Sequence, residues 1–146
     1  MIFIAHRGNI NGKTPKMENK PSYVKEALQN GFDAEIDVWF IDNKLFLGHD
    51  NPDFIINLDF LKNDKLWCHA KNIPALNFLL ENNIHCFWHE NDAVTLTSKG
   101  YMWTFPGEEL TPRSICLFPE KRKDEDYSIC KGICSDFIGE YKNEKR

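Results

Sequence analysis

Three clusters of reactive side chains follow, or lie within, short apolar runs of the sequence. They are His6-Arg7-Gly8, the pair Glu35 and Asp37, and Gly48-His49-Asp50. A histidine or arginine beside an apolar strand is costly to bury without a partner, so we expect these residues either at a rim or in a site. In parallel α/β folds the loops after the carboxyl ends of the strands build the active site. The sequence therefore predicts one site that combines the three clusters.

The two carboxylates indicate a bound cation. Strand alternation puts Glu35 and Asp37 on one face, where they repel each other unless positive charge lies between them. A hard divalent cation with oxygen ligands meets that need. The alternative is a pair of salt bridges, with Arg7 and with Lys71. Because histidines occur in both flanking clusters, the pattern favours a metal.

The two histidines suit proton transfer near neutral pH, since the ordinary pKa of the side chain is about 6.5. Cleavage of a phosphodiester needs one group that takes a proton from the nucleophile and one that protonates the leaving oxygen. His6 and His49 are the candidates for these roles, and Arg7 offers a bidentate fork for phosphate oxygens. Taken singly, each histidine is also compatible with an ordinary polar position at a rim.

Further candidates follow the later apolar runs. Lys71 could stabilise charge on a phosphoryl group, or it could be a rim lysine paired with an acid. His69 shares a strand face with Lys71. His89-Glu90 could line the pocket or belong to an exposed polar loop, and Trp103 could be a pocket wall or part of the core.

Elements that could position these side chains are visible in the apolar pattern. Asp42-Asn43 supplies a turn, so we expect the run that follows it to form a hairpin with the run before it. Eight runs rich in β-branched or aromatic residues predict strands: Ile2–Ala5, Ala34–Phe40, Leu45–Leu47, Leu66–His69, Cys86–His89, Tyr101–Phe105, Ile115–Phe118 and Ile133–Phe137.

Two clear helices are predicted between these strands. The first begins at Pro21 and ends at Gly31, and the second begins at Pro74 and ends before Asn82-Asn83. A short helical turn is expected at Leu58–Lys62 behind Asn57 as the N-cap. Alternation of strand and helix favours parallel βαβ units. A typical (β/α) barrel needs about 250 residues, so we expect a compact, shortened TIM-like (β/α) barrel with several crossover helices reduced to loops.

Length and composition limit the class of protein. A chain of 146 residues with 42% hydrophobic side chains suits a single domain over residues 1–146. The net charge is −4, so basic residues are not in excess over acidic ones, and a nucleic-acid partner is not expected. No apolar run approaches the roughly 18 residues that span a bilayer. The polar end, Lys142–Arg146, is expected to fray.

The cysteines bear on the compartment. They are five in number and lie mostly in apolar runs, which favours reduced, buried thiols in a cytoplasmic protein. Cys130 and Cys134 have a spacing that a zinc site could use, but no second pair accompanies them, so we favour the buried thiols.

Four segments in the first 50 residues carry a resemblance to a known family. IAHRG, MENKPSYVKEAL, AEIDVW and LFLGHD, in this order and spacing, resemble the opening of glycerophosphodiester phosphodiesterases and the wider phospholipase C-like phosphodiesterase superfamily. The segment GICSDF resembles the last barrel strand of that family, which closes on an Asp-containing turn. We therefore expect a single phosphodiesterase-like domain.

The resemblance implies a role for each matching residue. His6 and His49 would be the general acid and base, and Arg7 the phosphate contact. Glu35 and Asp37 would be metal ligands. The pair Glu18-Asn19 matches a Glu-Asn pair that organises the family's site before the first helix.

The chain departs from the family at His69, where members usually have an acidic residue two positions before the lysine. His69 is expected either as a metal ligand or as a hydrogen-bond donor to phosphate beside Lys71. The metal would be magnesium or calcium, with manganese as an alternative.

The predicted function is metal-assisted cleavage of a small phosphodiester, of the glycerophosphodiester or sugar- or polyol-phosphate type. Two alternatives stay open: a lyase that releases a cyclic phosphate, and a phosphodiester-binding module without turnover. Retention of both His6 and His49 argues against the binding module, because binding alone needs no pair of proton-transfer groups.

Overall fold

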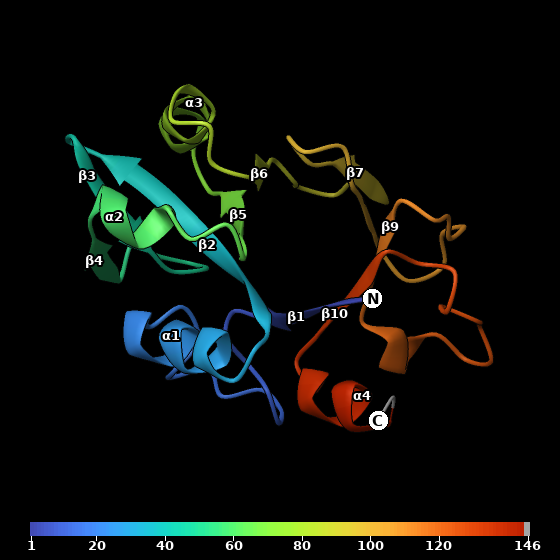
Figure 1. Cartoon of the computed structure of the whole chain (residues 1–146). Coiled ribbons are helices and arrows are strands. Elements are labelled where there is room, and N and C mark those ends of the chain that lie inside the picture. Colours follow the sequence, from blue (N-terminus) through green and yellow to red (C-terminus); the bar gives the residue numbers. More distant parts are fainter. Residues whose placement is uncertain (145–146) are drawn as a thin grey trace.

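The protein, described here by a computed structural model over residues 1–144, is built on one curved, mixed sheet (Figure 1). Figure 1 shows the strands around an open centre, with α1, α3 and α4 on the outer side. The strands are β1 (Ile2–His6), β2 (Asp33–Ile41), β3 (Lys44–Leu47), β4 (Phe54–Ile56), β5 (Leu66–Ala70), β6 (Cys86–Phe87), β7 (Val94–Leu96), β8 (Met102–Thr104), β9 (Ser114–Leu117) and β10 (Gly132–Ser135). The helices are α1 (Pro21–Gln29), α2 (Leu58–Leu61), α3 (Ile73–Glu81) and α4 (Ile138–Glu144), with a 3-10 turn at Pro119–Lys121.

The central strands run parallel to one another. Pairing follows the order β6-β5-β2-β1-β10-β9-β8, and every neighbouring pair in that series is parallel. Antiparallel strands flank it, with β3 and β4 continuing from the far half of β2 and β7 pairing with β8. Because parallel neighbours end at one edge of a sheet, the residues at the strand ends are brought together.

The prediction of a shortened TIM-like (β/α) barrel is wrong. Among residues 1–144 the structure has ten strands and only four α-helices, arranged as an open half-barrel rather than alternating β/α units. No pairing joins β6 to β7 in this part of the chain, so the sheet does not close. The link from β8 to β9 contains no helix, because its nine or so residues fall short of the roughly 10–12 that a crossover needs.

The local signals for helices and turns are confirmed. Pro21 opens α1, and the Asn57 side chain accepts a hydrogen bond from Phe60 N at the start of α2. In the hairpin between β2 and β3, Asp42 and Asn43 have φ of 50° and 59°, as a two-residue type I′ turn requires.

Three elements were not predicted from the sequence: β4, β7 and α4. The predicted strand Cys86–His89 is also shorter, since β6 contains only two residues. Part of the end expected to fray lies in α4, where Lys142 Nζ donates to the carbonyl of Asn30 at 3.1 Å. Residues 145–146 of that segment lie outside the described residues.

The core has an outer part, an inner part and a third part in which α1 and α4 pack against β1, β9 and β10. The outer part packs β2 and β5 against α1 and α3, with Val24, Ile36 and Leu79 fully buried. The inner part fills the half-barrel with aromatic side chains, including Trp67, Phe87 and Trp103.

The five cysteines are buried and unbridged, as the sequence predicted. No helix within residues 1–144 is both long enough and apolar enough to cross a membrane.

Candidate functional site

One cavity of about 500 Å³ lies at the open centre of the half-barrel. Its lining includes every residue predicted to touch a metal or a substrate: His6, Arg7, Glu35, Asp37, His49, His69, Lys71 and Trp103. His89 and Glu90 line it as well, so the pocket interpretation of that loop is confirmed. Trp103 both lines the cavity and belongs to the inner core, with 3% of its surface exposed.

Parallel pairing places the acidic residues and a histidine in one row. Glu35 lies beside His6 of β1, and Asp37 lies beside His69 of β5. Glu35 is 3% exposed and Asp37 is fully buried. Burial and the charge of Asp37 raise the pKa of Glu35. Burial acts to raise the pKa of Asp37 too, but contact with His69 and the charge of Arg7 outweigh it, so that pKa is lowered.

Each of these three side chains has one polar atom held by the protein. Asn19 Nδ2 donates to Asp37 Oδ2 at 2.8 Å, and the amide of Arg7 donates to Glu35 Oε2 at 3.3 Å. His69 Nε2 lies 3.1 Å from the carbonyl oxygen of His89. The second polar atom of each side chain therefore remains available.

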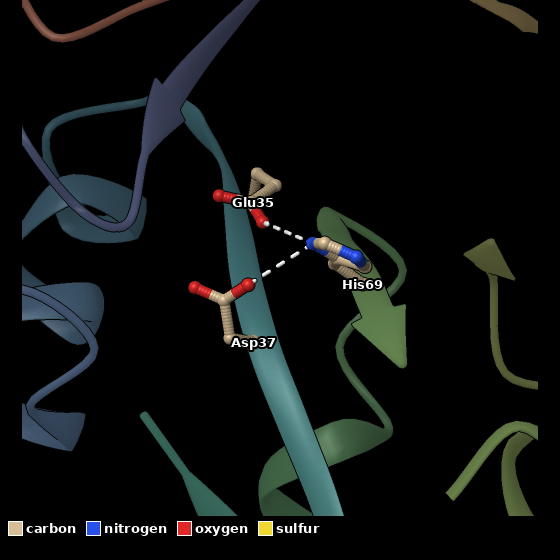
Figure 2. Close-up of side chains that lie close together, drawn as sticks. All are labelled: Glu35, Asp37 and His69. Carbon is tan, nitrogen blue, oxygen red and sulfur yellow. Dashed lines mark ion pairs between the residues drawn. The ribbon is translucent and has the colours of Figure 1, made fainter. Parts of the chain in front are cut away.

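The available atoms converge (Figure 2). His69 Nδ1 lies 3.1 Å from Asp37 Oδ1 and 4.0 Å from Glu35 Oε1. One ligand atom from each residue can be chosen so that all three lie within 4.8 Å of one another. Two ligands bound to one ion at about 2.1 Å are about 3.0 Å apart at right angles and about 4.2 Å apart when opposite. The distances from His69 Nδ1 fall in that range.

A buried orphan atom adds to the fit. Among the described residues, Asp37 Oδ1 makes no hydrogen bond although it is inaccessible to solvent. A buried carboxylate oxygen without a partner is costly, and a coordinated cation would satisfy it. These residues therefore fit a divalent cation held by two carboxylates and one imidazole.

Each of the two candidate acid–base histidines has its own aspartate. His6 Nδ1 lies 2.7 Å from Asp136 Oδ1, and His49 Nδ1 lies 2.8 Å from Asp50 Oδ1. Nε2 of each ring is therefore not used by the aspartate, and Nε2 of His6 lies 3.8 Å from Glu35 Oε2. His6 is buried, which lowers its pKa, but the bond to Asp136 and the charge of Glu35 dominate and raise it. His49 lies at the rim, with 40% of its side chain exposed.

Arg7 occupies a position between acids. Its Nε lies 3.5 Å from Asp37 Oδ2, and its Nη1 lies 3.7 Å from Glu18 Oε1. The ion pair of Arg7 with a carboxylate, foreseen as the alternative to a metal, is thus present beside the cation cluster. The corresponding pair with Lys71 is not formed within residues 1–144. Glu18 and Asn19 do not line the cavity; Glu18 accepts a hydrogen bond from Asn9 Nδ2 at 3.1 Å, and Asn19 Nδ2 donates to Asp37.

Sequence reasoning missed several contributors. Asp136, at the end of β10, orients His6, and Asn9 Nδ2 donates to the same Asp136 oxygen at 2.9 Å. Phe118 packs edge-on against the His6 ring with centroids 5.0 Å apart. The signal for Asp136 was available, because a polar residue directly follows an apolar strand there, as in the three original clusters.

Comparison with protein-family models, curated proteins and solved structures found no match for this chain.

Proposed function

We propose that this protein cleaves a small phosphodiester with the help of a divalent cation. One observation carries the proposal: a single cavity joins two aspartate-linked histidines to a three-residue cation site. The resemblance of residues 1–50 to glycerophosphodiester phosphodiesterases supports the same reaction. The open half-barrel does not support this reaction, so the proposal rests on the residues of the cavity.

The cation and the basic residues would receive the phosphate. Glu35, Asp37 and His69 would hold the divalent ion, which when bound would supply positive charge to neutralise the phosphate and polarise a phosphoryl oxygen. Lys71 lines the same cavity and is not engaged in an ion pair among the described residues, so its ammonium group can meet a phosphate oxygen. Arg7 presents a guanidinium group on the same wall.

The two histidines would move the protons. Asp136 occupies Nδ1 of His6, so Nε2 is the atom that exchanges a proton with the substrate. The hydrogen bond to Asp136 and the charge of Glu35 raise the pKa of His6, which favours the protonated ring and suits it to protonate the leaving oxygen. His49, whose Nδ1 faces Asp50, takes the proton of the nucleophile. The aspartates hold each ring in the required tautomer and orientation.

The product identifies the nucleophile. Attack by water gives a phosphate monoester and an alcohol, whereas attack by a neighbouring hydroxyl of the substrate gives a cyclic phosphate and the same alcohol. The two histidines supply the same proton transfers in either case.

The test is turnover of two phosphodiesters, bis(p-nitrophenyl) phosphate and glycerophosphocholine, with magnesium, calcium, manganese or no added metal. We expect metal-dependent cleavage that Asp37→Asn abolishes. The matched control is Asp59→Asn, which changes an exposed carboxylate on α2 with 82% side-chain exposure and leaves the cavity intact. Equal rates for the native protein and Asp37→Asn would contradict the proposal.

A further inference from the structure

The side chain of His69 is fixed in one orientation. Its Nε2 lies 3.1 Å from the backbone carbonyl oxygen of His89, and its ring stacks on Phe87 with centroids 5.1 Å apart and an interplanar angle of 14°. A carbonyl oxygen can only accept a hydrogen bond, so Nε2 is the nitrogen that carries a proton. In the neutral ring Nδ1 then presents a lone pair.

His69 Nδ1 faces two carboxylate oxygens. Asp37 Oδ1 lies 3.1 Å and Glu35 Oε1 4.0 Å from His69 Nδ1 (Figure 2). Three lone pairs in a buried site repel one another unless a proton or a cation lies among them. A proton on Nδ1 would serve Asp37 Oδ1 at 3.1 Å but not Glu35 Oε1, which at 4.0 Å is beyond hydrogen-bond distance, whereas one cation can contact all three atoms.

The outer contacts also match those of a metal-binding histidine. Such a histidine typically donates its other ring N–H to a carboxylate or a backbone carbonyl, which fixes the tautomer and makes the metal-facing nitrogen more basic. The carbonyl of His89 is in that position for His69. Asn19 and the Arg7 amide hold the two carboxylates in the same way.

We propose that the ion held by Glu35, Asp37 and His69 is a first-row transition-metal ion, coordinated through His69 Nδ1, rather than magnesium or calcium. The inference rests on the cation site of the proposed function and specifies its metal. Magnesium and calcium prefer ligand sets made of oxygen, whereas imidazole nitrogen favours transition ions. A site with two carboxylates and one fixed imidazole therefore discriminates by ligand chemistry.

The experiment measures metal binding without substrate. The full-length protein, stripped of metal, is titrated by calorimetry with manganese, cobalt, magnesium and calcium. The same titrations are made on His69→Glu, which gives the site a third carboxylate, and on His49→Gln as the matched control, since His49 lines the cavity outside the ligand cluster. We expect the native protein and His49→Gln to bind manganese and cobalt more tightly than magnesium and calcium. His69→Glu should gain affinity for magnesium and calcium.

A spectroscopic measurement keeps the inference testable if His69→Glu fails to fold. With cobalt bound to the native protein, the ring protons of a coordinated histidine should show strong paramagnetic shifts in the proton NMR spectrum. The inference is wrong if magnesium or calcium binds the native protein as tightly as manganese, or if no histidine signal is shifted by bound cobalt.

The outcomes separate this inference from the proposed function. If manganese is preferred but no phosphodiester is cleaved, the metal assignment stands and the proposed function fails. If phosphodiesters are cleaved and magnesium binds as tightly as manganese, the function stands and the metal assignment fails.

Discussion

Asn19 provides a quantitative test of how the site is held together. Its side chain makes two buried hydrogen bonds with Asp37, donating from Nδ2 to Oδ2 at 2.8 Å and accepting from the Asp37 amide at 2.9 Å. Asn19 is 1% exposed and has a φ of 64°. Glycine adopts that backbone conformation without strain, so Asn19→Gly removes the two bonds and leaves the turn intact.

The expected loss can be worked from these two bonds. A bond to a charged group contributes about 1.5–3 kcal/mol and a bond between neutral groups about 0.5–1.5 kcal/mol, so Asn19→Gly should lower the free energy of unfolding by about 2–4.5 kcal/mol. Because Asn19 also orients Asp37, a ligand of the proposed metal, metal affinity should fall by about 10–100-fold.

Urea denaturation of the native protein, Asn19→Gly and Asn57→Gly measures the effect. Asn57 is the matched control: its side chain makes one bond, at 3.1 Å, as the exposed N-cap of α2. Replacing an N-cap asparagine by glycine lowers the free energy of unfolding by only about a few tenths of a kcal/mol. If the two glycine variants are equally stable, the bonds of Asn19 do not support the site as argued.

Four further predictions concern the same cavity. His6→Ala and His49→Ala should each reduce turnover of an unactivated ester by roughly 10²–10⁴-fold, and the variant that lacks the acid should recover on a p-nitrophenyl ester; equal losses on both esters would refute the division of roles. Asp136→Asn should destabilise the metal-free protein most between pH 3.8 and 6.5. The lowered pKa of Asp136 adds stability that is lost as the pH falls below this window, and the raised pKa of His6 adds stability that is lost as the pH rises above it. Urea titrations at several pH values measure the difference in stability, and a pH-independent difference would count against the ion pair. Millimolar manganese should raise the melting temperature of the native protein but not of Glu35→Gln, and equal shifts in the two proteins would remove Glu35 from the ligand set. Gly48→Ala should abolish turnover and destabilise the fold, since a Cβ at φ 153° would lie 1.8 Å from a backbone oxygen; a fully active variant would show that this turn does not position His49.

The candidate site was predictable because its residues obey a local rule. Polar residues at or near the ends of parallel strands meet the polar residues of a neighbouring strand: His6 of β1 pairs with Glu35, and His69 of β5 pairs with Asp37, both within β2. The rule needs only the order of strand and polar residue along the chain. It does not need the number of helices, which explains why the cavity lining was predicted although the fold class was not.

The partners of the site residues were harder to predict. The contact of Asp136 with His6 joins residues 130 positions apart, through the parallel pairing of β1 with β10. Nothing local to His6 indicates which acid will lie beside it. The orientation of His69 also depends on a distant backbone carbonyl, that of His89, which no sequence pattern specifies.

The closed barrel failed as a prediction because closure depends on long-range pairing. Strand β6 has two residues and β7 and β8 have three each, so each offers few hydrogen bonds to a neighbour. The apolar pattern marks where strands begin, but it does not show that β7 runs antiparallel to β8 and that β6 stays unpaired on one side within residues 1–144.

The most direct test of the central claim is phosphorus NMR of glycerophosphocholine incubated with the native protein and manganese. The claim predicts loss of the diester resonance and growth of a monoester or cyclic phosphate resonance, with neither change for Asp37→Asn or when a chelator replaces the metal. The contrary result is a diester resonance that persists when the native protein is given manganese, magnesium, calcium or cobalt. If bis(p-nitrophenyl) phosphate also stays intact under these conditions, the claim that this cavity cleaves phosphodiesters is contradicted.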